Sequence, residues 1–71
     1  MIDTKKVRAR MLILGLTQHA VAKQMGINTA TLNQKINNNR RMYIDEFFKL
    51  CEILKLHTEE ERNGLLGVAL I

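Results

Sequence analysis

The amino-acid sequence predicts an all-α fold of five short helices. Apolar residues recur three or four positions apart, which is the spacing of one helix face. Each of these segments begins next to a residue type that caps helices or favours their first turn, and the first two are followed by glycine. A chain of 71 residues can bury one small core, so we expect residues 1–71 to form a single domain.

The first helix is expected over about residues 5–14. Asp3 or Thr4 can cap its start, and Gly15 ends it because only glycine adopts a left-handed conformation cheaply. Its buried face would consist of Val7, Met11 and Leu14.

Residues 17–37 predict a helix-turn-helix. Thr17 caps a helix over 18–25, Gly26 provides the turn, and Asn28 caps a second helix. Only a narrow stripe of this second helix is apolar, namely Leu32 and Ile36. The remaining positions carry hydroxyls, amides and the cation Lys35, and no acidic residue, as suits a helix that enters a DNA groove.

A fourth helix is expected over about 44–54, with one broad apolar face: Ile44, Phe47, Leu50, Cys51 and Leu54. Thr58 and Glu61 have the spacing of a capping box, which favours a short fifth helix at the start of the tail, 58–71. The glycines and the apolar end of this tail are equally compatible with a strand or an arm.

Composition limits the function classes. A single cysteine, Cys51, excludes a disulfide within the chain and a cysteine-rich zinc site. We expect no catalytic residue, no metal, no cofactor and no small-molecule substrate. No apolar stretch approaches the roughly 20 residues that cross a bilayer, so we expect a soluble, cytoplasmic protein without membrane contact.

Charge is divided unevenly along the chain. Residues 1–41 carry eight Lys or Arg against one Asp, a net charge of +7, whereas residues 42–71 carry three against six acidic residues, a net charge of −3. A basic half that contains the helix-turn-helix is the charge pattern of a DNA-binding surface, because each neutralised phosphate releases counterions. The acidic half is expected to point away from DNA.

These residues resemble the helix-turn-helix domains of phage repressors and Cro proteins over roughly 7–56. The resemblance is carried by Leu16-Thr17-Gln18, Ala22, Met25-Gly26-Ile27, Thr31-Leu32, Ile36-Asn37 and the helix 46–54. It implies a lambda-repressor-like fold of five helices whose third helix lies in the major groove of double-stranded operator DNA. The size and the segment 33–41 further resemble phage lysis-lysogeny switch proteins, which act in the cytoplasm of a bacterial host cell.

The resemblance also implies roles for single residues. The base edges would face Thr29, Asn33 and Gln34. Phosphates, or a protein partner, would be contacted by Gln18, Thr31, Lys35, Asn37, Asn38, Arg40 and Arg41. Residues 37–39 depart from the frequent Asn-Gly turn of the family, and the two arginines then supply charge near the DNA backbone. Ala30 stands where the family often has a polar base reader, so specificity would rest on few residues.

Surplus apolar residues predict a protein interface, because exposed apolar patches are normally small. Leu12 and Ile13 lie off the buried face of the first helix, and Ile53 lies about opposite the buried face of the fourth. The other three are in the tail: Val68, Leu70 and Ile71. Leu12 and Ile13 are equally expected to pack under the tail.

The sequence supports two functions of different classes. The first is a transcriptional regulator that binds its operator as a homodimer, because one such module buries too little surface for operator affinity. Its recognition helices would lie about 34 Å apart, with the C-terminal portion as dimer surface. The second is an antirepressor, of the kind called a modulator of repression, which would bind the phage's main repressor protein and mask its DNA-reading helix.

Overall fold

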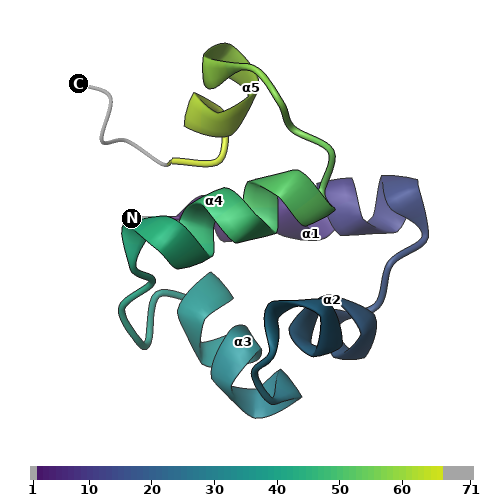
Figure 1. The fold of residues 1–71 in the computed structure, drawn as a ribbon, viewed down its shortest axis with the longest axis vertical. Helices are drawn as coiled ribbons and strands as arrows, with labels where there is room; N and C mark the ends of the chain where they lie inside the picture. The colour runs from purple at the N-terminus through teal and green to yellow at the C-terminus, as the bar shows by residue number, and fades with distance from the viewer. Residues whose placement is uncertain (1, 67–71) are drawn as a thin grey trace.

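The computed structural model describes residues 2–66, and these form five helices (Figure 1). Their bounds are α1 Thr4–Leu14, α2 Gln18–Met25, α3 Thr29–Ile36, α4 Ile44–Ile53 and α5 Glu59–Asn63. Outside the helices, Ile2 and Leu66 form an isolated antiparallel bridge. The prediction of an all-α fold is therefore confirmed, including the short fifth helix.

Local capping explains where the first three helices begin. The Asp3 carboxylate, the Thr17 hydroxyl and the Asn28 amide oxygen each accept a hydrogen bond from a backbone N–H in the first turn of α1, α2 and α3. Thr4, the alternative cap of α1, instead donates its hydroxyl to the Ile36 carbonyl at 2.7 Å. α1 and α2 end at glycines with left-handed backbone angles, φ 68° and 74°.

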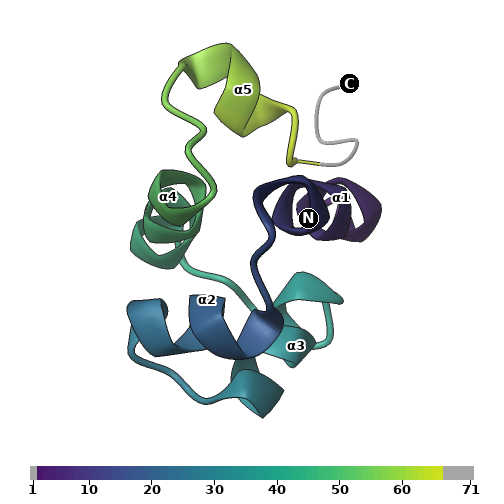
Figure 2. The same ribbon diagram turned by 90° about the vertical axis from the view of Figure 1, so that its right-hand side faces the viewer.

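The helices surround one core. α2 and α3 lie at one end of the molecule and α5 at the other, with α1 and α4 between them (Figures 1 and 2). The acidic α5 is thus at the opposite end from the helix-turn-helix. The buried apolar residues are Ile2, Val7, Met11, Val21, Ala22, Met25, Leu32, Ile36, Phe47, Leu50, Cys51, Leu54, Leu56 and Leu65.

Two expectations about α4 were wrong. Ile44, predicted to be in the buried face, is 67% exposed, because it is the first residue of the helix and extends past the core. Ile53, predicted to lie opposite that face, is half-buried and packs against the core. It lines a shallow pocket together with Gln24 of α2, so α2 approaches that side of α4.

The other residues of the predicted protein interface have different outcomes. Leu12 and Ile13 are 81% and 72% exposed, as expected for positions off the buried face of α1. Val68, Leu70 and Ile71 lie outside the described residues.

The C-terminal part of the fold is held by caps and by two arginines. The Thr58 hydroxyl accepts from the Glu61 N–H, and the Glu61 carboxylate accepts from the Thr58 N–H, which confirms the capping box. Arg62 donates to the His57 carbonyl at 3.0 Å, and Arg10 of α1 donates to the Leu54 carbonyl at 2.9 Å. The Arg10 bond holds the end of α4 against α1, whereas the capping box and the Arg62 bond shape the start of α5 locally.

Candidate nucleic-acid interface

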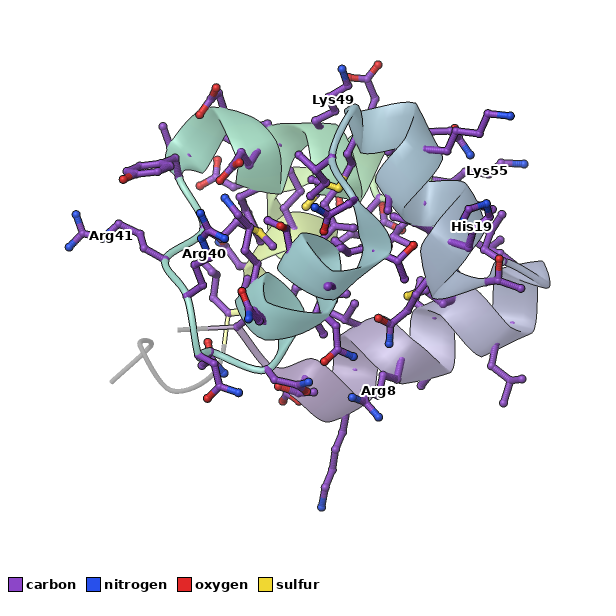
Figure 3. The ribbon with its side chains drawn as sticks, turned by 90° about the horizontal axis from the view of Figure 1, so that it is seen from below. Arg8, His19, Arg40, Arg41, Lys49 and Lys55 are labelled. Carbon is purple, nitrogen blue, oxygen red and sulfur yellow. The ribbon has the colours of Figure 1, made fainter. Side chains whose placement is uncertain are left out.

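The surface formed by α2 and α3 presents α3 among positive charges. Figure 3 views this surface with α3 at its centre. Arg40 and Arg41 lie on one side of α3, while Arg8 of α1 and His19 of α2 lie on other sides (Figure 3). The polar helix thus has arginines from two different segments around it, α1 and the residues after α3, as contact with a phosphate backbone on either side of a groove requires.

A chain of hydrogen bonds crosses this surface and joins three helices. Arg8 donates from Nη2 to the Asn37 Oδ1 at 3.0 Å. Asn37 donates from Nδ2 to the Asn33 Oδ1 at 3.0 Å. Asn33 donates from Nδ2 to the Gln18 Oε1 at 3.1 Å. The side chains of α3 are therefore already organised in the absence of DNA.

The three predicted base readers differ in their surroundings. Gln34 is exposed, and nothing within residues 2–66 hydrogen-bonds its amide. Thr29 is half-buried, with its hydroxyl 3.3 Å from the His19 Nδ1. Asn33 is half-buried and has both ends of its amide engaged, so it is the least available of the three.

Lys35 does not lie where a phosphate contact was expected. Its side chain is only 7% exposed, and its Nζ is 2.6 Å from both carboxylate oxygens of Glu46. It also lies 5.5 Å from the centre of the Tyr43 ring. This position corrects the expectation, because the charge is neutralised inside the domain.

The sequence contained a signal for the burial of Lys35. It follows Leu32 by three positions and precedes Ile36, so helical spacing places it at the edge of the buried stripe. Its partner could not be recognised, since Glu46 belongs to α4, eleven positions away. The hydrogen bond from Lys35 lowers the pKa of Glu46, and a second one from the Tyr43 N–H lowers this pKa further.

Asn38 also has a structural task instead of the expected external contact. Its φ of 63° is left-handed, a conformation that asparagine adopts more readily than most other residues. Its Nδ2 donates to the Ile2 carbonyl and its Oδ1 accepts from the Ile2 N–H, both at 2.9 Å. Because both ends of the amide hold Ile2, neither is free for a phosphate.

Of the remaining predicted contacts, Gln18, Thr31 and Asn37 are half-buried at the surface, whereas Arg40 and Arg41 are exposed. Within residues 2–66, neither arginine forms an ion pair. These two cations are therefore available to an external anion. Arg8 was not singled out from the sequence, because its role depends on the approach of α1 to α3.

The described part of the chain lacks the features of a membrane span and of a metal centre. There, no helix is long and apolar enough to cross a membrane. No three His, Cys, Asp or Glu side chains in residues 2–66 gather as a metal ion would require. Burial raises the pKa of the Cys51 thiol, so this residue is a poor nucleophile and serves as a small core residue.

Comparison with known proteins identifies the family of the domain that forms this surface. A family model described as the Cro/C1-type HTH DNA-binding domain matches residues 6–60. The match spans α2, α3 and α4 completely and contains every member of the hydrogen-bond chain. Searches of curated proteins and of solved structures found no match to this chain.

Proposed function

Since the chain belongs to the Cro/C1-type helix-turn-helix DNA-binding family, we propose that it regulates a phage lysis-lysogeny switch by placing α3 in the major groove of operator DNA. Membership of this family makes it a DNA-binding transcription regulator whose target is double-stranded DNA. The observation that supports the proposed docking is the position of α3, a polar helix flanked by exposed arginines without an ion-pair partner in residues 2–66.

Each part of this surface has a proposed role. Gln34 and Thr29 read base edges, because the Gln34 amide is exposed and Thr29, the first residue of α3, has only the His19 ring 3.3 Å from its hydroxyl. Arg40 and Arg41 contact phosphates on one side of the groove, and Gln18 does so at the start of α2. Thr31 adds a phosphate contact near the start of α3, whereas both ends of the Asn37 amide are engaged by Arg8 and Asn33.

Operator binding is proposed to involve a homodimer in the cytoplasm of a bacterial host. A module of this size buries about 600 to 1,000 Å² of protein surface on DNA, less than most specific operator complexes use. Two copies would place their recognition helices about 34 Å apart, one turn of DNA. α5 lies at the opposite end from α3, so it can meet a second copy without blocking the groove-facing surface.

The proposal is tested by titrating the chain against its own upstream intergenic DNA at several salt concentrations. About five phosphate contacts predict that the logarithm of the affinity falls with the logarithm of salt at a slope of about −4 to −5. Failure to shift this DNA at low salt would contradict the proposed operator binding. Sedimentation of the complex reports its stoichiometry, and a single copy per operator would contradict the dimer.

The second candidate function is the antirepressor, which binds the phage's main repressor protein. It is favoured by apolar surface that DNA binding does not use: Leu12 and Ile13 on α1 are largely exposed. In addition, Met42, Ile44 and Phe47 line an open pocket to which Arg40 and Arg41 also contribute. A protein contact with an apolar centre would depend on salt far less than phosphate contacts do.

The double substitution Leu12→Ser and Ile13→Ser distinguishes the two candidates. Operator affinity is expected to stay within about twofold, and the free energy of unfolding within about 0.5 kcal/mol, because both side chains are exposed. Binding to the repressor would instead weaken at least tenfold if these residues form its docking surface. The measurements are gel shifts with and without the neighbouring repressor gene's product, and Ala9→Ser on the same helix is the control. An operator affinity that falls with the double substitution would place this side of α1 against DNA.

A further inference from the structure

We propose that Asn33 is a positioning residue that turns the amide NH₂ of Gln18 toward a DNA phosphate, with Arg8 setting the direction of the whole hydrogen-bond chain. Asn33 then contributes to affinity for every DNA sequence instead of reading a base. This inference rests on the proposed binding of DNA by α3. It assigns a role to Arg8, which lies on α1 outside the helix-turn-helix.

The direction of the chain follows from the chemistry of its first member. An arginine guanidinium donates hydrogen bonds and accepts none, so the atom of Asn37 that faces Arg8 must be its oxygen. The Asn37 NH₂ must then point to Asn33, where it meets the Asn33 oxygen. The Asn33 NH₂ is left to meet Gln18, and there it meets the Gln18 oxygen. Each amide orientation is thus determined by the one before it.

The last member of the chain presents a donor to the DNA side. Gln18 is the first residue of α2, and its Oε1 is occupied by Asn33, so its free amide group is the NH₂. Phosphate oxygens only accept hydrogen bonds, and the amino end of a helix carries partial positive charge. An amide flipped the other way would place a lone pair against the phosphate. Orientation of Gln18 therefore decides whether this contact attracts or repels.

The same bonds make Asn33 a poor base reader. Asparagine recognises adenine by using its oxygen and its NH₂ together. In this chain the oxygen accepts from Asn37 and the NH₂ donates to Gln18, and the side chain is half-buried. Reading a base would require breaking both bonds. Recognition of individual base pairs is therefore assigned to Gln34 and Thr29.

A double-mutant cycle on DNA tests the inference with Asn33→Ala, Gln18→Ala and the combination. Asn33→Ala is expected to weaken binding by about 2- to 10-fold, the effect of one hydrogen bond, equally on the operator and on all its single-base variants. In the Gln18→Ala background the same substitution should change affinity less than twofold, because the amide that it orients is gone. Gln34→Ala is the control, and it should change the preference at one base pair.

Three results would overturn the inference. Loss of preference at a single base pair in Asn33→Ala would make Asn33 a base reader, and additive losses in the cycle would make the two residues independent. A normal affinity of Asn33→Ala would show that the orientation has no effect. Absence of DNA binding by the unsubstituted chain would contradict the proposed function itself, which separates the two failures.

A second readout needs no DNA and covers the case of a poorly folded variant. The side-chain NH₂ resonances of Gln18 and Asn37 are compared between the unsubstituted chain and the conservative variant Asn33→Ser, after circular dichroism has verified the helix content. The chain predicts that both resonances shift. Unchanged resonances in a folded variant would contradict the hydrogen-bond chain.

Discussion

Replacement of Glu46 by glutamine is expected to lower the free energy of unfolding by about 2 kcal/mol at pH 7. The substitution leaves the ammonium group of Lys35, whose side chain is 7% exposed, without a counter-charge. Breaking a fully buried pair costs about 3 to 5 kcal/mol, and exposed pairs contribute at most about 1 kcal/mol. The Glu46 side chain is 23% exposed, which places this pair between the two cases.

Substitution of the other member of the pair, Lys35, should lower the free energy of unfolding much less. This difference between the two variants is the critical test. Lys35→Met removes the buried charge, keeps the apolar stem and leaves Glu46 able to accept from the Tyr43 N–H. We expect a loss below about 1 kcal/mol. Urea denaturation of both variants measures the difference, with Glu52→Gln on the exposed side of α4 as control. Equal losses in the two variants would mean that burial of the lysine charge does not dominate.

The same pair makes stability depend on pH in the acid range. The pKa of Glu46 in the folded protein is lowered from its ordinary value of 4.5, chiefly by the hydrogen bond from Lys35. The contribution of ionised Glu46 to the free energy of unfolding is therefore fully present above pH 4.5. It is lost as the pH falls through the lowered pKa. Glu61 adds to this trend, since the backbone N–H groups of Thr58 and His57 lower its pKa as well. Between pH 6 and pH 3, Glu46→Gln should lose less stability than the unsubstituted chain.

Gln34→Ala is expected to cost about 1 to 3 kcal/mol of operator binding, all of it at one base pair. The amide of Gln34 is exposed on α3 and has no hydrogen-bond partner within residues 2–66, so its donors and acceptor are available to a base edge. The salt dependence should stay unchanged, because no charge is removed. Affinities for a set of single-base operator variants measure the effect. A uniform loss over the whole set would contradict base reading.

The matched experiment is the double substitution Arg40→Ala and Arg41→Ala. Two lost phosphate contacts should make the slope of log affinity against log salt about 1.8 less steep. The loss should be the same for operator and unrelated DNA, since phosphates carry no sequence information. Lys55→Ala serves as control, because it removes an exposed cation that is distant in sequence from Arg40 and Arg41. A changed base preference with an unchanged slope would reverse the roles assigned to Gln34 and the arginines.

The helices were predictable because their signals are local. Caps such as Thr17 and Asn28 accept hydrogen bonds from N–H groups three positions along the chain, and the capping box that begins α5 spans the same distance. The apolar spacing likewise identified buried residues of α1 and α3, namely Val7, Met11, Leu32 and Ile36. Ile44 was misplaced because spacing assigns a residue to a face but does not show where along the helix the core ends.

The sequence by itself determined the helix-turn-helix, the polar surface of α3 and the basic charge of the first half of the chain. Only the tertiary structure decided which of these polar groups are free to meet DNA. Lys35 pairs with Glu46 eleven positions away, Asn38 holds Ile2 across 36 positions, and Arg8 reaches Asn37 across 29. The buried cation of Lys35 requires a partner, and the exposed Asn38 and Arg8 bond to groups that folding brings close. All three pairings depend on packing between helices, which no local pattern encodes.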